Sequence, residues 1–128
     1  MKANILVILF LTTTLFSCTK KSDDPAAAVD ITTGTWRVSY YWDQKDETSN
    51  FSAYYFMFLS NGTFMAHDNS GAVTGTWSIS GSKLSINFTN PLLSELNNDW
   101  LITEKTTTSI KLKEDNPAQD DQLYFTKN

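Results

Sequence analysis

Few residues of this chain could carry covalent or metal chemistry. His67 is the sole histidine and Cys18 is the sole cysteine. Asp68 follows His67, but successive side chains of a strand point to opposite faces, so these two residues cannot act as a catalytic dyad. One histidine and one cysteine are too few for a histidine-rich zinc site or a cysteine–histidine nucleophile. We therefore expect no enzymatic activity, no metal and no cofactor, and we interpret His67 as a strand residue near a turn.

Acidic residues form pairs in segments that we predict to be loops, namely Asp46-Glu47, Glu114-Asp115 and Asp120-Asp121. Carboxylates are preferred ligands of calcium, but the glycine-containing loop of common calcium sites does not surround these pairs. We interpret them as solvated loop charges. The chain has 10 Lys and Arg against 14 Asp and Glu, which gives a formal net charge of −4. Because the basic residues form no stripe, we expect no nucleic-acid partner.

The chemistry expected of Cys18 is covalent attachment of lipid. Lys2 is followed by an apolar run over residues 5–11, which is too short to span a bilayer and is typical of a secretory signal. The end of this segment, Leu15-Phe16-Ser17-Cys18, resembles the lipobox of bacterial lipoproteins. The resemblance implies a signal peptide over 1–17, cleavage before Cys18, and acyl chains on its sulfur and on the new N-terminus. We thus expect an outer-membrane lipoprotein of the cell envelope, facing the periplasm or the cell surface.

Residues 18–33 are predicted to be a flexible tether behind the lipidated cysteine. The segment is polar and then rich in alanine, so it has little apolar surface to bury. Ser22-Asp23-Asp24 resembles the acidic signal that sends Bacteroidetes lipoproteins to the cell surface. A solvated linker explains the same residues equally well, and both interpretations stay open.

Residues 34–128 show the pattern of an all-β domain. Apolar and polar residues alternate in short runs that are separated by turn residues, which is typical of an antiparallel meander closed into a barrel. Asn61-Gly62 between two apolar runs predicts a hairpin with a type I′ turn, in which both residues have positive φ. A short helical turn is possible over 92–96. The predicted strands cover 35–43, 54–59, 64–67, 73–79, 84–88, 99–104, 108–114 and 122–127.

The tetrapeptide Thr-Gly-Thr-Trp occurs twice, with Gly34 and Trp36 in the first copy and Gly75 and Trp77 in the second. We interpret both copies as strand entries that help to close the barrel, where glycine lets the backbone bend and tryptophan fills the interior. With an eight-stranded meander, this motif resembles lipocalins, and more closely the small lipocalin-like domains of Bacteroidetes lipoproteins. The resemblance implies an up-and-down barrel of the lipocalin or calycin type that binds a small apolar or aromatic ligand, or a partner protein.

The interior of the predicted barrel is rich in aromatic rings. An eight-stranded barrel is just wide enough for side chains to fill or for one small ligand. We therefore predict a largely filled core with a shallow pocket at one end, rimmed by Tyr40, Trp42 and Tyr54, where rings could stack on a flat ligand. The predicted interior comprises Trp36, Val38, Tyr40, Trp42, Tyr54, Phe56, Phe58, Phe64, Trp77, Ile79, Leu84, Ile86, Phe88, Trp100, Ile102, Ile110, Leu112, Leu123 and Phe125.

The predicted strand 54–59 is apolar on both faces, because Tyr55, Met57 and Leu59 alternate with the interior residues. A barrel wall needs only one apolar face, so we expect the outer face to be covered. The cover could be the segment 92–96, the tether, a second copy of the chain or a partner protein. Two functions stay open: a ligand- or partner-binding lipoprotein, and a filled accessory module of an envelope complex with no small-molecule ligand.

Overall fold

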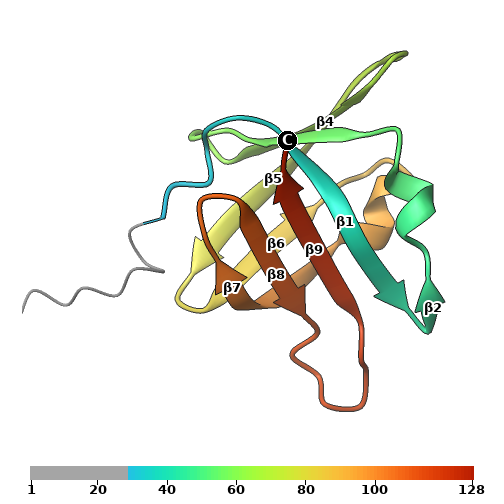
Figure 1. Cartoon of the computed structure of the whole chain (residues 1–128), viewed down its shortest axis with the longest axis vertical. Coiled ribbons are helices and arrows are strands. Elements are labelled where there is room, and N and C mark those ends of the chain that lie inside the picture. The colour runs from blue at the N-terminus through green and yellow to red at the C-terminus, as the bar shows by residue number, and fades with distance from the viewer. Residues whose placement is uncertain (1–28) are drawn as a thin grey trace, which may run out of the picture.

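A computed structural model describes residues 29–128, which form a closed antiparallel β-barrel (Figure 1). The predicted signal peptide 1–17, Cys18 and the acidic pair Asp23-Asp24 lie outside the described residues. The strands are β1 (Trp36–Asp43), β2 (Lys45–Asp46), β3 (Tyr55–Phe58), β4 (Thr63–Asp68), β5 (Gly71–Ser80), β6 (Lys83–Asn87), β7 (Asn98–Lys105), β8 (Ser109–Lys113) and β9 (Gln122–Lys127). Two short 3₁₀-helices, η1 (Thr48–Phe51) and η2 (Leu93–Leu96), complete the fold.

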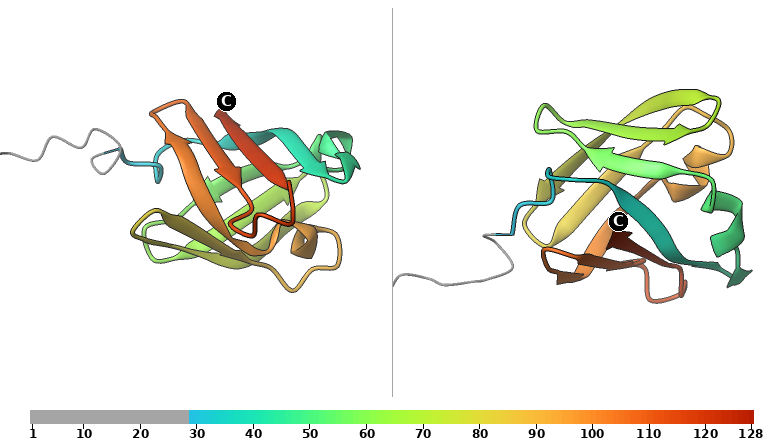
Figure 2. Two further views of the ribbon diagram at one scale, coloured as in Figure 1. Left: turned by 90° about the horizontal axis from the view of Figure 1, so that it is seen from below. Right: turned by 45° about the horizontal axis from the view of Figure 1, so that its top comes forward.

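Apart from β2, the strands follow one another around the barrel in sequence order, as the views in Figure 2 show. The barrel closes where β1 pairs with β9, from Trp36 opposite Lys127 to Trp42 opposite Gln122. The predicted eight-stranded up-and-down meander is confirmed, and the two-residue β2 is an addition at the end of β1. The helical turn predicted over 92–96 is present as η2.

The predicted hairpin between β3 and β4 is present, but its predicted turn type is wrong. Gly62 has a φ of 86°, whereas Asn61 is not among the described residues with positive φ. The Asn61 side chain instead accepts a hydrogen bond from the backbone N–H of Thr63, at 3.0 Å. Asparagine thus serves this turn through its side chain rather than through a left-handed backbone.

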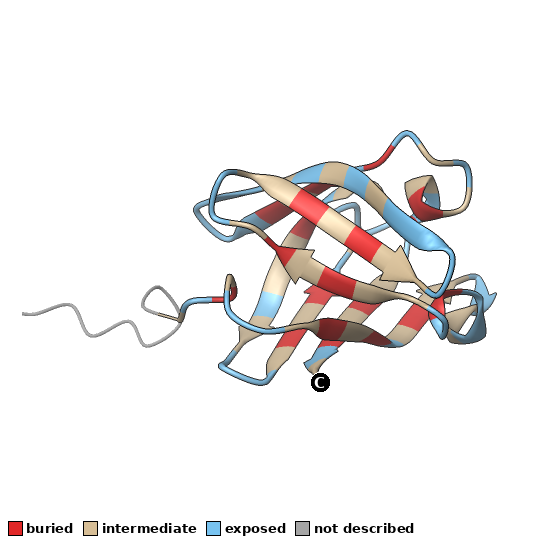
Figure 3. Cartoon of the chain, turned by 90° about the horizontal axis from the view of Figure 1, so that it is seen from above, coloured by how far each residue is buried: buried red, intermediate tan, exposed pale blue. Residues whose placement is uncertain are grey.

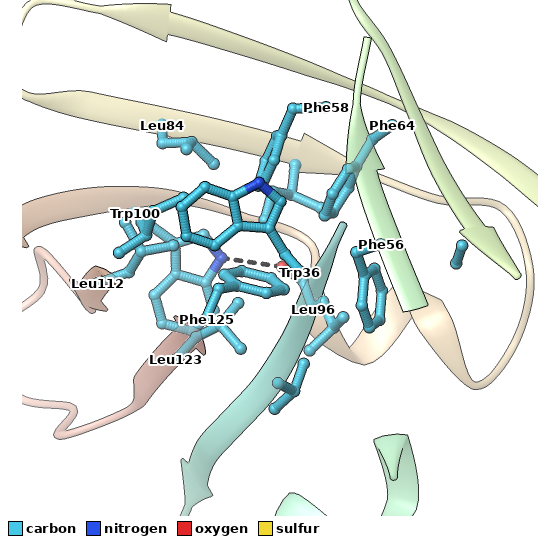
Figure 4. Close-up of a cluster of buried hydrophobic side chains, with 14 of the residues drawn as sticks. Trp36, Phe56, Phe58, Phe64, Leu84, Leu96, Trp100, Leu112, Leu123 and Phe125 are labelled. Atoms are coloured by element: carbon cyan, nitrogen blue, oxygen red, sulfur yellow. Dashed lines mark hydrogen bonds between the residues drawn. The ribbon is translucent and has the colours of Figure 1, made fainter. Parts of the chain in front are cut away.

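The interior is filled by side chains, as predicted from the aromatic content. The ring of Phe58 stacks on Phe64 with centroids 4.3 Å apart, and it meets Trp36 and Phe125 edge to face at 6.3 and 5.8 Å. Figure 4 shows these rings converging from several strands, and Figure 3 shows buried positions that alternate with intermediate or exposed positions along the strands. Among the described residues, no polar or charged residue is buried. The barrel axis is therefore occupied by apolar groups of the chain itself.

Six of the predicted interior positions are not buried, although three of them, Tyr54, Trp77 and Ile102, pack against the core as partly buried residues. A register shift between Val38 and Tyr40 turns β1 over, so that Tyr41 faces the interior with 3 % exposure. Tyr40 and Trp42 consequently lie on the outside, which corrects their interior assignment. Ile79 is 37 % exposed near the end of β5, and Ile102 is only partly buried beside a second shift in β7. A bulge of this kind inserts one residue and reverses the alternation beyond it.

Two helical turns complete the core with residues that alternation does not reveal. Phe51 of η1 is buried and meets Tyr41 edge to face at 5.3 Å. Leu93 and Leu96 of η2 are fully buried in the same core cluster. The Tyr41 hydroxyl donates a 2.8 Å hydrogen bond to the backbone oxygen of Glu95, which ties η2 to β1. The two turns therefore pack against the barrel core from the loops that follow β2 and β6.

The two Thr-Gly-Thr-Trp copies play different parts. Trp36 is fully buried, and its Nε1 donates to the backbone oxygen of Ile31 at 3.1 Å, so residues just before the barrel also pack against it. Trp77 is half-buried and donates to the backbone oxygen of Leu59 at 2.9 Å. Gly34 has a φ of 75°, and Gly75 lies so close to Phe88 that a Cβ would stand 2.6 Å from its ring. Both glycines are thus required by the local backbone, as predicted.

Within residues 29–128, the two helices are short 3₁₀-turns, and neither is long and apolar enough to cross a membrane.

Candidate functional site on the outer wall

The three residues predicted to rim a pocket do not lie together at a barrel mouth. Tyr40 and Trp42 are half-buried on the outer wall, opposite Tyr124 and Gln122 of β9. Tyr54 precedes β3 and packs against the core, with its ring 6.2 Å from that of Phe56. Tyr40 and Trp42 therefore remain candidates for binding only on the outside of the barrel.

The strand register arranges the outer wall of β6–β9 and β1 in two rows, because directly paired residues of antiparallel strands share a face. The first row runs from β6 to β1 as Lys83, Leu101, Lys113, Gln122 and Trp42. The second row runs from β7 to β1 as Glu104, Lys111, Tyr124 and Tyr40. Rings, amides and charges thus alternate across the wall.

The second row is held by contacts among its own members. The Lys111 ammonium lies 3.5 Å from a Glu104 carboxylate oxygen and 5.6 Å from the centroid of the Tyr124 ring. Tyr40 and Tyr124 are in ring contact at 5.2 Å, and the Tyr124 hydroxyl donates to Gln122 at 2.6 Å. A hydrogen bond from Ser109, with help from Lys111, holds the pKa of Glu104 below its ordinary value. These contacts fix the positions of the side chains in the second row.

A groove of about 470 Å³ lies where the loop between β8 and β9 meets the first row. Its volume is in the range of small-molecule sites, roughly 300–1,000 Å³. Outward-facing strand residues form one side, among them Leu101, Gln122 and Tyr124. The loop forms the other side with Glu114, Asp115, Pro117, Gln119, Asp120 and Asp121. The candidate site is therefore outside the barrel, and we call it the outer groove.

Hydrogen bonds within the loop hold its shape. The backbone N–H of Glu114 donates to the Asp121 oxygen at 2.9 Å, which closes the base of the loop. The Asn116 side chain accepts from Ala118 at 3.0 Å, and the N–H of Asn116 itself donates to a Glu114 carboxylate oxygen at 3.0 Å. Lys83 reaches from the wall to Asp115 at 2.7 Å. Both sides of the groove are thus held in place by interactions within the chain.

The electrostatics of the outer groove are dominated by carboxylates. Partial burial, followed by the negative charges of Asp43, Glu114 and Asp120, raises the pKa of Asp121 above its ordinary value. Burial likewise raises the pKa of the nearby Tyr41 hydroxyl, with Asp43 as the next cause. Among the described residues, however, no three acidic, histidine or cysteine side chains are placed so that they could hold a metal ion.

The outer face of β3 is the other candidate surface. The segment 92–96, one of the covers that we considered, does not lie over it. Leu93 and Leu96 of η2 face the core, so η2 does not cover this face. Tyr55 is instead flanked by Arg37, whose guanidinium lies 4.6 Å from the ring centroid, and by His67, whose ring stacks on it at 5.4 Å. His67 is thus a half-buried strand residue that packs against an aromatic ring.

The parts of the outer groove could be predicted from the sequence, but their contact with one another could not. The acidic pairs and the alternating outer residues of the strands were recognised separately, as loop charge and as wall. Their contact depends on the register of β7, β8 and β9 and on the path of a loop without periodicity. Only the presence of four acids within the loop 114–121 hinted at a charged surface there.

Solved structures place the chain in the lipocalin-like fold. A DUF4847 family protein from Bacteroides vulgatus has 18 % sequence identity and a TM-score of 0.58, with 77 % of this chain and 94 % of that chain covered. A lipocalin-like protein from Bacteroides uniformis has 16 % identity and a TM-score of 0.56, with 77 % of this chain and all 100 % of that chain covered. No protein-family model and no curated protein matches the sequence. The predicted resemblance to lipocalin-like domains of Bacteroidetes is confirmed at the level of fold.

An uncharacterized protein from Bacteroides eggerthii is similar over the same region. It has 15 % identity and a TM-score of 0.54, with 76 % of this chain and 99 % of that chain covered. At identities this low, the likeness is one of fold, and function must be argued from the site itself.

Proposed function

We propose that this protein is a lipid-anchored lipoprotein of the cell envelope that binds a small ligand on the outer wall of a filled barrel. The observation that carries the proposal is the occupied interior, in which Trp36, Phe58 and Phe125 meet along the barrel axis. A lipocalin-like barrel is compatible with ligand binding, but a filled one leaves its outer surface for that purpose. The outer groove offers the concavity and the mixture of apolar and polar groups that ligand sites have.

Support for the anchor comes from the sequence. The junction Leu15-Phe16-Ser17-Cys18 follows a short apolar run, and the described barrel begins after a further stretch of chain. Several acyl chains hold a protein on a membrane far more firmly than one chain does. This arrangement would hold the barrel at the membrane surface, facing the periplasm or the outside.

The anchor is tested by the variant Cys18→Ala in the native host. We expect this variant to leave the membrane fraction and to lose labelling by a palmitate analogue, whereas Cys18→Ala with an added transmembrane segment returns to the membrane without labelling. Membrane labelling that persists in Cys18→Ala would overturn the anchor proposal. Protease treatment of intact cells, compared with an Asp23→Ala, Asp24→Ala variant, distinguishes a surface signal from a linker.

Ligand uptake in the outer groove is tested by narrowing it. Leu101→Trp would add a large side chain to the wall of the groove without touching the core, because Leu101 faces outward in the first row. We expect this variant to keep its melting temperature and to lose binding of extracted envelope metabolites. Thr74→Trp is the matched control, because Thr74 is exposed on β5 outside the groove, and it should leave that binding unchanged.

The alternative is an accessory module with no small-molecule ligand. It is favoured by the outer face of β3 and β4, where Met57 lies directly opposite Met65 and both are half-buried. Such a surface can contact a second protein. Replacing Met57 and Met65 together by Thr should release a crosslinked partner under this alternative, and it should leave ligand binding in the outer groove unchanged under our proposal.

A further inference from the structure

The outer groove combines an apolar wall with a negative rim. On the wall, the outward-facing Leu101 stands between two lysines of the first row, and the Tyr124 ring lies one row away. The rim is the loop 114–121, whose backbone is closed by the bond from Glu114 N–H to the Asp121 oxygen. A ligand seated here would therefore touch hydrocarbon on one side and carboxylates on the other.

The negative charge of the groove is not balanced by the chain. Among the groove residues, Glu114, Asp115, Asp120 and Asp121 face a single cation, Lys113. Lys83 is already engaged with Asp115 at 2.7 Å, and Lys111 is engaged with Glu104 and Tyr124.

Asp121 is the carboxylate with most to gain from an added cation. Within residues 29–128, neither the Asp120 nor the Asp121 side chain makes a hydrogen bond or an ion pair, although Asp121 is only partly exposed. Partial burial raises its pKa, which means that its charged form is held at a cost. A cation brought beside it would offset that cost.

The shape of the groove selects among cations. No three acidic side chains in the described part of the chain are placed to coordinate a metal ion, whereas the groove volume of about 470 Å³ suits a molecule of several heavy atoms. An ammonium or guanidinium group forms charge-assisted hydrogen bonds with single carboxylates and needs no closed coordination shell. Leu101 and the adjoining ring would cover the apolar part of the same molecule.

We propose that the outer groove binds a small organic cation, in which an ammonium or guanidinium group contacts the rim at Asp120 and Asp121 while an apolar body lies against Leu101. This inference rests on the proposed use of the outer groove as a ligand site, and it adds the chemical class of the ligand.

The test is calorimetric titration of the purified full chain, in non-ionic detergent, with 2-phenylethylamine. The comparison ligands are 2-phenylethanol, which is neutral, 3-phenylpropionate, which is negative, and calcium chloride. We expect saturable binding of the amine, binding of the alcohol that is weaker by about tenfold or more, and no binding of the carboxylate. Asp121→Asn should weaken the amine by about tenfold, whereas Glu95→Gln, which removes one exposed charge from η2, should leave it unchanged.

The remaining outcomes separate this inference from the site on which it rests. If the amine and the alcohol bound equally well and both lost binding in Leu101→Trp, the preference for a cation would be overturned. The groove would still stand as a ligand site. Calcium that displaces the amine, or equal weakening by Asp121→Asn and Glu95→Gln, would likewise overturn the inference. Absence of saturable amine binding would overturn it directly, with a melting temperature of Asp121→Asn at or slightly above that of the unmodified protein showing that the fold was intact.

Discussion

The interior and the outer wall of this barrel differ in the kinds of side chain that they contain and in how these side chains interact. The interior is apolar throughout the described residues, and its rings pack on one another at centroid distances such as 4.3 and 5.4 Å. The outer wall alternates rings with charges in register, and one part of it borders a groove whose lining includes four carboxylates. Burial stabilises the first region, while the second keeps polar groups in contact with solvent. Under the proposed function, stability depends on the interior and ligand binding depends on the outer wall, so we expect substitutions to affect one without the other.

The largest effect is expected where an interior ring is removed. Trp36→Ala should lower the free energy of unfolding by about 3–5 kcal/mol, because a fully buried side chain is lost and surrounding side chains relax only partly into the cavity. Trp42→Ala on the outer wall should change it by less than about 1 kcal/mol. Chemical denaturation of both variants checks the pair, and equal losses would remove the distinction between the two regions.

Gly75→Ala should lower the free energy of unfolding by about 1–3 kcal/mol, as overpacking does in a close-packed core. The added Cβ would stand 2.6 Å from the Phe88 ring and would also meet the backbone oxygen of Asn87, which cannot move without disturbing β6. Binding in the outer groove should be unaffected, since Gly75 lies outside it. A thermal melt that matches the unmodified protein would show that β5 and Phe88 can separate freely.

Two neighbouring tyrosines sharpen the comparison within a single strand. Tyr41→Phe should cost about 1 kcal/mol, since it removes the 2.8 Å hydrogen bond to the backbone oxygen of Glu95. Tyr40→Phe should cost less than about 0.5 kcal/mol, because its hydroxyl group is on the outer wall. Denaturation midpoints measured side by side test the bulge in β1, and the reverse ranking would mean that strict alternation holds there.

The smallest effect is expected at Asp121, and it depends on pH. The raised pKa means that Asp121 binds its proton more tightly in the folded state than in the unfolded state, where the pKa of an aspartate is ordinarily 3.8. Stability conferred by Asp121 is therefore lost as pH rises from 3.8 through the folded-state pKa. Asp121→Asn should melt at a slightly higher temperature than the unmodified protein near neutral pH, and the two should converge in acid. A variant that melts lower at neutral pH would indicate a partner for this carboxylate.

Much of the interior could be predicted from alternation alone. The interior residues of β3, β6, β8 and β9 follow a strict period of two, because each strand has one face on the core. The error in β1 arises at a register shift, which changes which side chains face inward without any sign in composition. Phe51 was missed because an isolated apolar residue in a short 3₁₀-turn has no periodicity to detect, whereas the turn with Leu93 and Leu96 was predicted without placing these two residues in the interior.

The outer groove could be predicted only in pieces. Lys83, Leu101 and Lys113 are each ordinary strand residues, and they become one row only through the pairing of β6 with β7 and of β7 with β8. The path of the loop 114–121 depends on hydrogen bonds such as those made by Asn116. These bonds join residues that are close in sequence, and they set the position of the rim relative to the wall.

The most direct test of the central claim asks whether anything enters the interior. The full chain, in non-ionic detergent, is titrated with an environment-sensitive apolar dye and then with a fatty acid, while emission of the tryptophans is followed. Because Trp36 is fully buried among side chains that already fill the axis, we predict no saturable dye binding, no displacement and no change in tryptophan emission. Saturable binding of one dye molecule at micromolar affinity, displaced by the fatty acid and abolished in Phe58→Trp but retained in Leu101→Trp, would show an internal binding cavity and would contradict the account.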